Sequence, residues 1–222
     1  MTESSKTIII AGTKKDSIGR VIGERLHKRG WNIWLYSRHA ARVERDGWHE
    51  RAMDISSEKS IQAFLRAIPR VDAAIMSADP SGHGELKDLT EKKIKEFFNA
   101  KVVGSLLLAK LLLTPTDSKP VKMIWLIGKT GVKPKNLIAY ALANAALAQL
   151  SEQLNKTFTN VKAYVLPLGV ISPSTMGDAY MREHPKQTFE PDSPESVAKA
   201  VEEILLGGVP AGIVPRDQSK MV

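Results

Sequence analysis

Residues 7–26 read Thr-Ile-Ile-Ile-Ala-Gly-Thr-Lys-Lys-Asp-Ser-Ile-Gly-Arg-Val-Ile-Gly-Glu-Arg-Leu, an apolar run that breaks into a polar turn and then a helical repeat. The run from Ile8 to Ala11 predicts a fully buried strand, and Gly12 permits a sharp exit from it. The apolar positions that follow recur at helical spacing, namely Ile18, Val21, Ile22 and Leu26. A helix that begins here would present unpaired N–H groups and the positive end of its dipole to a pyrophosphate.

The turn between this strand and helix departs from the usual glycine-rich phosphate-binding sequence. Ser17 stands where the middle glycine is expected, and the turn is longer by one residue. An ordinary strand-to-helix turn therefore remains an alternative for this segment taken alone. The elements that follow along the chain favour the phosphate site.

The size and composition of the chain indicate one α/β domain. A length of 222 residues suits a single central sheet with helices on both faces, and the domain is expected to span residues 1–222. The hydrophobic share of 43% and the charged share of 25% are those of a soluble globular protein. Cysteine is missing from the sequence, which excludes disulfides and thiolate metal sites. His83 and His184 lack further ligands at metal-binding spacing, so no metal site is predicted.

The charge and the apolar stretches bear on partners and location. The net charge is +8, but Lys and Arg are spread along the chain and alternate with acids, so no nucleic-acid partner is predicted. An anionic cofactor or substrate accounts for part of the excess. Residues 1–6 carry no signal-peptide core, and the most apolar stretch, 102–113, is too short to span a bilayer. The sequence therefore predicts a cytoplasmic protein with no membrane partner.

Strand-like and helical patterns alternate along the chain. The expected strands are 7–11, 31–36, 73–77, 122–127 and 162–167, with shorter ones at 51–53 and 211–214. The expected helices are 18–29, 57–67, 90–113, 137–158 and 193–206. This alternation predicts an α/β fold with a doubly wound parallel sheet of the Rossmann type.

Two long polar connections, 79–89 and 173–191, follow the carboxyl ends of expected strands. Open α/β sheets bind their ligands at those ends, so both segments are predicted substrate-side loops. Within the second loop, Met176, Tyr180 and Met181 recur at helical spacing and are candidates for an apolar lid over substrate or a cover for the core.

With Tyr140 and this order of elements in view, the chain resembles the short-chain dehydrogenase/reductase family over nearly its full length. The resemblance implies a nicotinamide dinucleotide cofactor and places it by matched positions. These are Gly12, Ser17, Ile18 and Gly19 in the glycine-rich turn, Asp54 and Ile55 at the adenine, Ser77 and Ala78 where the family has Asn-Ala-Gly, and Pro167, Gly169 and Ile171 near the nicotinamide.

The end of the second expected strand bears on which dinucleotide is bound. NAD-dependent folds place an acid there to grip the ribose hydroxyls, whereas this strand ends in Tyr36-Ser37-Arg38-His39. Arg38, helped by Lys14 or Lys15, can pair with a ribose phosphate through charge-assisted hydrogen bonds. The sequence therefore favours NADP(H), with Ser37 and Arg38 at that phosphate. The alternative is that these three basic side chains are only solvated charges.

The catalytic positions implied by the resemblance are only partly conventional in this chain. The family uses a serine to hold the carbonyl, a tyrosine as proton donor, a lysine beside the tyrosine and an asparagine that anchors a water. Tyr140 matches the tyrosine, but the serine position falls on Gly128. The lysine position is Asn144 and the asparagine position is Lys101, so these two residue types have exchanged places.

We expect the exchange to preserve a proton relay if Lys101 and Asn144 face each other across the site. Lys101 would then place a cation near Tyr140, which favours the phenolate, while Asn144 orients a water. The alternative is that Lys101 is a surface lysine and that the active site has decayed. Thr130, with Lys129, follows the strand end and is a candidate replacement for the missing serine, unless the segment is only a tight turn.

The sequence predicts an atypical member of the family that uses NADPH to reduce a carbonyl or an activated double bond in a small organic molecule, with Tyr140 as proton donor. Two other classes remain open: a catalytically silent NADP(H)-binding regulator or partner subunit, and a non-redox isomerase or cyclase on the same scaffold. In this family the helices that match 90–113 and 137–158 often pair across a two-fold axis. A homodimer or homotetramer is expected on that ground, although their apolar residues also suit packing under the sheet.

Overall fold

A mostly parallel sheet with the strand order β3-β4-β2-β1-β5-β6-β7-β8 forms the centre of the protein. The structure, a computed structural model, describes residues 5–77, 85–113, 120–128, 138–183, 185, 188 and 190–214. The strands are β1 (Thr7–Ala11), β2 (Asn32–Ser37), β3 (Val43–Arg45), β4 (Trp48–Ala52), β5 (Ala73–Met76), β6 (Val121–Gly128), β7 (Val161–Leu168) and β8 (Gly212–Ile213). The order reverses between β1 and β5, and open α/β sheets bind ligands outside the carboxyl ends of the strands at such a point.

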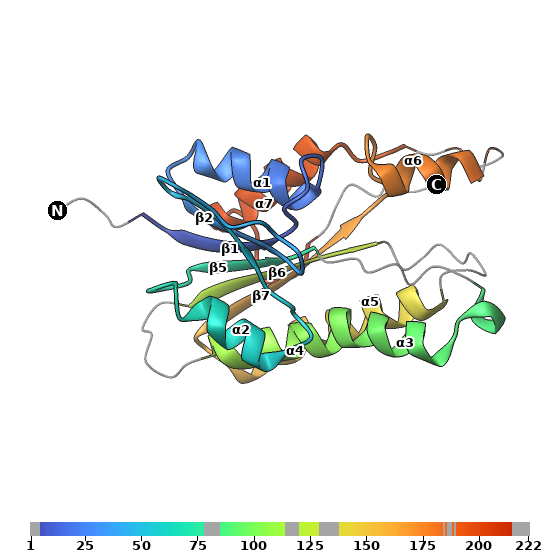
Figure 1. The fold of residues 1–222 in the computed structure, drawn as a ribbon, viewed down its shortest axis with the longest axis horizontal. Helices are drawn as coiled ribbons and strands as arrows, with labels where there is room; N and C mark the ends of the chain where they lie inside the picture. Colours follow the sequence, from blue (N-terminus) through green and yellow to red (C-terminus); the bar gives the residue numbers. More distant parts are fainter. Residues whose placement is uncertain are drawn as a thin grey trace.

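Helices cover both faces of the sheet (Figure 1). α1 (Ile18–His27) and α7 (Pro194–Leu206) lie on one face, and α2 (Glu58–Leu65), α4 (Gly104–Leu112) and α5 (Ile138–Thr157) lie on the other. α3 (Glu91–Phe98) leads toward α4, and α6 (Thr175–Glu183) lies on the same side as α1. Because side chains alternate along a strand, each face has its own apolar core: Ile8 and Ile10 of β1 pack toward α1 and α7, and Ile9 packs toward α2, α4 and α5.

The fold class predicted from the sequence is confirmed, and the five long apolar runs match strands whose ends differ by at most one residue from those expected. The sequence did not predict β3, a three-residue edge strand that pairs antiparallel with β4. Glu44 and Arg45 of β3 are exposed, so the strand has no apolar run to reveal it. β4 begins three residues before the expected strand 51–53, because its buried positions include the carboxylate Glu50 beside Trp48.

Two expected segments differ in local structure. The expected helix 90–113 is divided by a π-helical turn, η2 (Asn99–Val103), which lies between α3 and α4. Such π turns are frequent at functional sites. The expected loop 173–191 contains α6, and the described part of the loop 79–89 contains a short 3-10 turn, η1 (Leu86–Asp88). Within the described ranges, no helix has both the length and the apolar character needed to cross a membrane.

Candidate functional site

The turn after β1 depends on two glycines that serve different purposes. Gly12 has a φ of +109°, a conformation that side chains disfavour, and its N–H donates to the Tyr36 carbonyl at 2.8 Å. Gly19 is buried so close to the end of β1 that an added β-carbon would overlap the Ala11 carbonyl oxygen. Gly12 therefore lets the chain turn, and Gly19 lets α1 approach the strand, which are the roles that glycines have in dinucleotide-binding turns.

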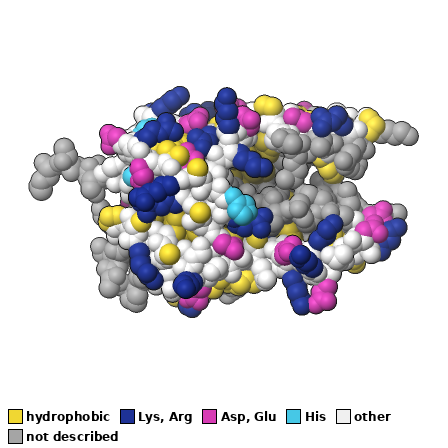
Figure 2. All heavy atoms as spheres, viewed as in Figure 1, with side chains coloured by type: hydrophobic (Ala, Val, Ile, Leu, Met, Phe, Trp, Pro, Cys, Tyr) yellow, Lys and Arg dark blue, Asp and Glu magenta, His cyan; other side chains and the backbone are white. Residues whose placement is uncertain are grey.

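Ser17, the residue in place of the middle glycine, caps α1. Its hydroxyl oxygen accepts a hydrogen bond from Arg20 N at 3.3 Å and donates to the Lys14 carbonyl at 2.8 Å. The first turn of α1 contains no acidic residue, and Lys14 and Lys15 are exposed without a carboxylate partner among the described residues. On the face shown in Figure 2, Lys and Arg side chains are interspersed with Asp and Glu side chains. Lys14 and Lys15 outnumber Asp16, the one acidic residue of this turn, so the amino end of α1 is electrostatically complementary to an anion.

The end of β2 brings Arg38 toward the predicted adenine position. The pKa of the Asp54 carboxyl is lowered chiefly because the Ser56 hydroxyl donates a hydrogen bond to it, and the nearby Arg38 guanidinium lowers it further. Ser37 and Thr13 share a hydroxyl–hydroxyl hydrogen bond of 2.9 Å, which joins the end of β2 to the turn after β1. The predicted ribose and adenine residues therefore lie at one edge of the sheet.

The end of β5 is tied to β1 at the point where the strand order reverses. The Ser77 hydroxyl donates to the Ala11 carbonyl at 2.7 Å. Ile55 is buried beneath this edge and packs against Gly104, where an added β-carbon would lie 2.8 Å from Ile55 Cγ1. Ala78 lies outside the described residues, so its predicted contact with the cofactor stays a prediction.

The chain leaving β7 is fixed by Asp192, which the sequence had not indicated. Gly169 N donates to Asp192 Oδ2 at 2.7 Å, and Ile171 forms a parallel bridge with Asp192. Pro167 is still part of β7, where it lies opposite Ile127 of β6. The segment predicted to approach the nicotinamide is therefore anchored at the start and at the end of the loop that contains α6.

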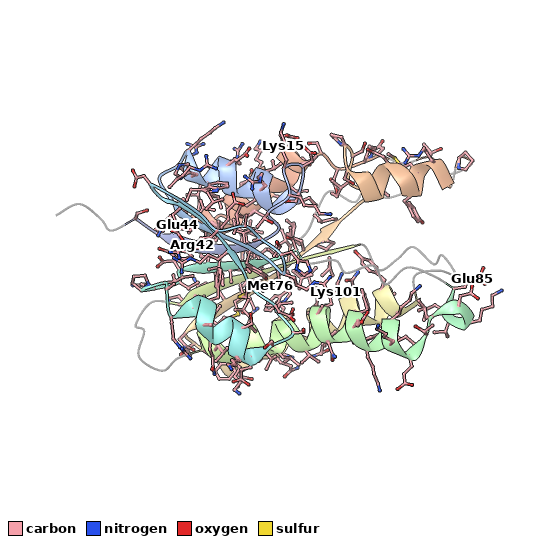
Figure 3. The ribbon with its side chains drawn as sticks, in the orientation of Figure 1. Lys15, Arg42, Glu44, Met76, Glu85 and Lys101 are labelled. Atoms are coloured by element: carbon pink, nitrogen blue, oxygen red, sulfur yellow. The ribbon has the colours of Figure 1, made fainter. Side chains whose placement is uncertain are left out.

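Lys101 is buried and lies against Tyr140. Its side chain comes from the π-helical turn on the α4 side of the sheet, opposite the face that carries Lys15 (Figure 3). Lys101 is only 4% exposed, and its Nζ lies 4.1 Å from the centre of the Tyr140 ring and 5.9 Å from that of Phe97. The alternative that Lys101 is a surface lysine is therefore wrong.

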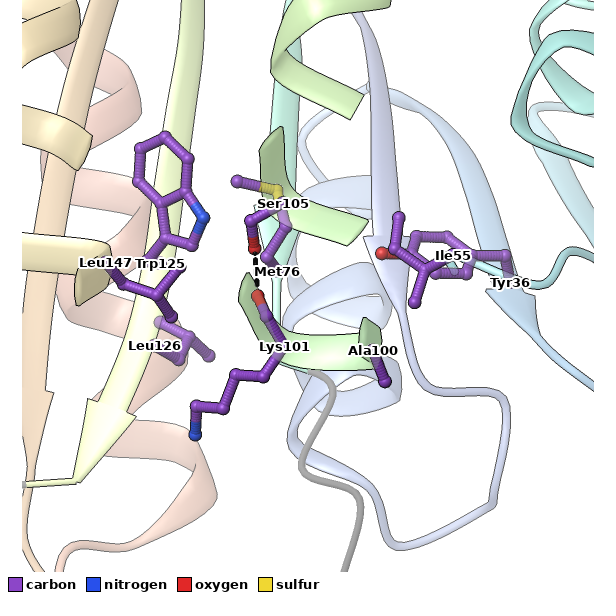
Figure 4. Close-up of a pocket in the computed structure, with 9 residues that line it drawn as sticks. All are labelled: Tyr36, Ile55, Met76, Ala100, Lys101, Ser105, Trp125, Leu126 and Leu147. Carbon is purple, nitrogen blue, oxygen red and sulfur yellow. Dashed lines mark hydrogen bonds between the residues drawn. The ribbon is translucent and has the colours of Figure 1, made fainter. Parts of the chain in front are cut away.

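A small cavity lies behind Lys101 (Figure 4). Its lining residues are Tyr36, Ile55, Met76, Ala100, Lys101, Ser105, Trp125, Leu126 and Leu147. The Ser105 hydroxyl donates to the Lys101 carbonyl at 2.6 Å, while the Lys101 side chain points away from Ser105. The cavity has room for about one water molecule, so it is too small to be a substrate pocket.

Tyr140 and Asn144, one turn apart on α5, hold the two sides of the Gly128 backbone. Gly128 N donates to the Tyr140 hydroxyl oxygen at 3.1 Å, and Asn144 Nδ2 donates to the Gly128 carbonyl at 3.0 Å. Asn144 is fully buried, and its Oδ1 has no hydrogen-bond partner among the described residues. An added β-carbon on Gly128 would lie 2.7 Å from the Tyr140 hydroxyl. Tyr140 therefore occupies the space that a serine side chain at position 128 would need.

Several predicted residues lie outside the described part of the chain. They are Lys129 and Thr130, the candidate replacements for the serine, and the loop residues His83 and His184. Among the described residues, no group of three or more His, Asp or Glu side chains is arranged to hold a metal ion.

Sequence reasoning missed the two residues that hold the turn from the side. Arg20 Nε donates to the Thr13 carbonyl at 3.0 Å, and Arg20 Nη2 donates to Glu50 at 2.8 Å. One signal was present, because an arginine in the first turn of a helix opposes the helix dipole unless an acid lies nearby. The acid itself is 30 residues further along the chain, and no local pattern connects the two.

Comparisons with known proteins agree with this geometry. The sequence profile of the family described as short chain dehydrogenase matches residues 6–184, whereas a comparison with curated protein sequences gives no match. A solved short-chain dehydrogenase from Streptomyces avermitilis is similar at 18% identity, with 99% of this chain and 90% of that chain covered and a TM-score of 0.80. The ligand-free aldohexose dehydrogenase of Thermoplasma acidophilum is similar at 15% identity, with 95% and 91% covered and a TM-score of 0.78. An NADH-dependent reductase, A1-R', complexed with NAD is similar at 15% identity, with 98% and 97% covered and a TM-score of 0.75.

Proposed function

Because the chain belongs to the short-chain dehydrogenase family, we propose that it is an oxidoreductase that uses NADP(H) to reduce a carbonyl or an activated double bond in a small organic molecule. The observation that carries the proposal is the buried Lys101 ammonium group over the ring of Tyr140. A buried cation needs a compensating interaction, and the face of a tyrosine ring supplies one. The pair lies on the carboxyl side of the same sheet as the glycine turn.

The residues at the sheet edge fit a dinucleotide. The positive φ of Gly12 and the acid-free first turn of α1 suit a pyrophosphate, with Lys14 and Lys15 beside it. One relative of the same fold is an NADH-dependent reductase, but Arg38 here follows β2 where an acid would suit NAD(H), so we assign the phosphorylated form. When bound, the reduced cofactor supplies the hydride.

The proton in this proposal comes from the Tyr140 hydroxyl. Lys101 places a positive charge beside the ring, and Gly128 N donates a hydrogen bond to the hydroxyl oxygen, so both stabilise the phenolate that remains after proton transfer. The buried Asn144 Oδ1 has no partner among the described residues and would accept a hydrogen bond from a water that relays a proton from solvent to the Tyr140 phenolate. The exchange of lysine and asparagine then keeps both functions, with each group supplied from the opposite helix.

The proposed partners are a small-molecule substrate and further copies of the chain. Exposed apolar side chains lie on two helices of the face opposite α1, with Leu106 on α4 47% exposed and Leu142 on α5 59% exposed. Burial of such side chains is favourable, and a second copy of the same face is the partner we propose. The segments 79–89 and 173–191 are the proposed substrate-side loops.

NADPH consumption with a panel of aldehydes, ketones and activated alkenes tests the proposal. Tyr140→Phe is expected to lower kcat by about 100-fold or more, which is the lower range for loss of a general acid. Lys101→Met, which keeps the length of the side chain but removes the charge, is expected to lower kcat by about tenfold. Lys110→Met is the matched control, because Lys110 is exposed on α4 and pairs with Glu58 at 2.8 Å.

A fluorescence titration with NADPH separates the possible outcomes of this assay. Unchanged turnover in Tyr140→Phe and Lys101→Met would contradict the assigned mechanism. Binding of NADPH without turnover of any compound would favour the silent cofactor-binding class, for which the absence of a serine at position 128 is the supporting observation. No binding of NADPH would overturn both.

A further inference from the structure

The carbonyl of Thr13, the first residue after Gly12, is held by a side chain from α1. Arg20 donates to this carbonyl through Nε at 3.0 Å and through Nη2 at 2.6 Å. The Thr13 hydroxyl shares a hydrogen bond of 2.9 Å with Ser37 at the end of β2. Thr13 is therefore held through both its main chain and its side chain. This fixes the position from which residues 14–16 continue.

Arg20 is in turn held by a buried carboxylate. Both oxygens of Glu50 accept from Arg20 Nη2 at 2.8 Å, and Trp48 Nε1 donates to Glu50 Oε1 at 2.9 Å. The Arg20 guanidinium lies 5.6 Å from the centre of the Trp48 ring. The side chains of Arg20 and Glu50 are 16% and 8% exposed, so the pair is largely out of water.

A buried pair of this kind contributes little net stability, because the cost of taking two charges out of water offsets most of their attraction. It does fix geometry, since a guanidinium is a planar group whose donors point in set directions. The positive charge of Arg20 is matched by Glu50, so it is not available to attract a phosphate in the way that the exposed Lys14 and Lys15 are.

We propose that Arg20 is a positioning residue which, held by Glu50, fixes the Thr13 carbonyl and so pre-organises the turn 13–17 for the pyrophosphate of a dinucleotide. This inference rests on the proposed function. A pre-organised turn binds more tightly because it loses less conformational freedom when the ligand arrives. A lysine at position 20 keeps the charge but cannot donate to Thr13 and Glu50 from one rigid plane.

Arg20→Lys tests the inference against a matched control, Arg25→Lys. Arg25 lies near the other end of the same helix and pairs with the buried Glu202 at 2.5 Å, and it bonds none of the residues of the turn. Arg20→Lys is expected to raise the Kd of NADPH and that of NADH by about the same factor, on the order of tenfold, with kcat at saturating cofactor unchanged. Arg25→Lys is expected to leave both Kd values within about twofold of wild type.

The outcomes are distinguishable. A wild-type protein that binds neither dinucleotide would overturn the proposed function, whereas equal Kd values for the two lysine variants in a protein that binds NADPH would overturn only the role of Arg20. If Arg20→Lys raises the Kd of NADPH but not that of NADH, Arg20 contacts the ribose phosphate itself, which also contradicts the proposal. If Arg20→Lys lowers Tm, the double variant Arg20→Met/Glu50→Gln replaces the whole ion pair with neutral groups and is expected to show the same rise for both dinucleotides.

Discussion

The helices α1 and α6 begin in the same way but differ in what their amino ends can bind. In each, a glycine is packed so tightly that an added β-carbon would overlap a backbone carbonyl oxygen, that of Ala11 for Gly19 and that of Ile171 for Gly177. Each helix is also capped by a serine, since Ser17 accepts from Arg20 N and Ser174 accepts from Gly177 N. The backbone device is therefore shared.

The difference lies in the charges around the two amino ends. In α6, the carboxylate of Asp178 accepts from the Ser172 hydroxyl at 2.7 Å and from Ser174 N at 3.2 Å, so an internal anion already occupies this end. In α1, no acid lies in the first turn, and in the turn before it the exposed Lys14 and Lys15 outnumber Asp16. Close helix packing thus creates the opportunity for an anion site, and the neighbouring charges decide whether an external anion can use it.

The largest expected effect comes from filling the space at the two glycines. Gly19→Ala pushes α1 away from β1 in the centre of the sheet. We expect this variant to lose about 3 kcal/mol of unfolding free energy and to lose NADPH binding as well. Gly177→Ala disturbs a helix at the edge of the fold and displaces the Ile171 carbonyl, so we expect a loss of about 1 kcal/mol and a smaller weakening of NADPH binding than in Gly19→Ala. Urea unfolding and a fluorescence titration measure both. If the two variants lose the same unfolding free energy and the same affinity for NADPH, the packing of Gly19 matters no more for the cofactor site than that of Gly177.

A smaller effect is expected from removing the positive charges at the amino end of α1. The double variant Lys14→Ala/Lys15→Ala is expected to weaken NADPH binding by about tenfold at low salt, because each removed charge lowers the attraction for phosphate. The loss should shrink as salt is added, since ions screen exposed charges. Lys92→Ala/Lys93→Ala, on the exposed part of α3, is the control. A salt-independent loss would point to altered folding of the turn instead.

The smallest effect is expected at the amino end of α6, which the Asp178 carboxylate already occupies. Asp178→Asn keeps the shape of the side chain but removes the charge at the amino end of α6, and we expect a loss of about 0.5 kcal/mol in urea unfolding. Asp16→Asn, in the turn before α1, is the comparison variant, because Asp16 is exposed and bonds no other described residue. If Asp178→Asn changes the unfolding free energy no more than Asp16→Asn does, the charge of Asp178 does not stabilise the amino end of α6.

Much of the fold follows from local patterns in the sequence. Strands such as β1 and β6 are buried on both faces, so they appear as continuous apolar runs. The edge strand β3 has no such run, and α6 lies within a segment whose composition is polar and rich in proline. Local apolar periodicity therefore indicates the centre of the sheet more clearly than its margins.

The candidate site was less accessible to sequence reasoning, because its key contacts join distant segments. Matched positions raised the hypothesis that Lys101 lies near Tyr140, and the Lys101 Nζ lies 4.1 Å from the centre of the Tyr140 ring. The pairing of Arg20 with Glu50 and the anchoring of Gly169 by Asp192 cross 30 and 23 residues respectively. Neither follows a motif or a periodicity, so only the folded chain reveals them. The roles of Thr130 and Ala78 stay predictions.

The hydroxyl of Tyr140 rests against Gly128, and this contact affects how the protein can be re-engineered. A serine introduced at position 128 would collide with the tyrosine ring in its present rotamer. Substitutions at touching positions are not additive, so the effect of one depends on whether the other has already been made. A designer who wishes to install the family's usual serine must first give the aromatic ring another place to lie, which makes the order of the changes as important as their identity.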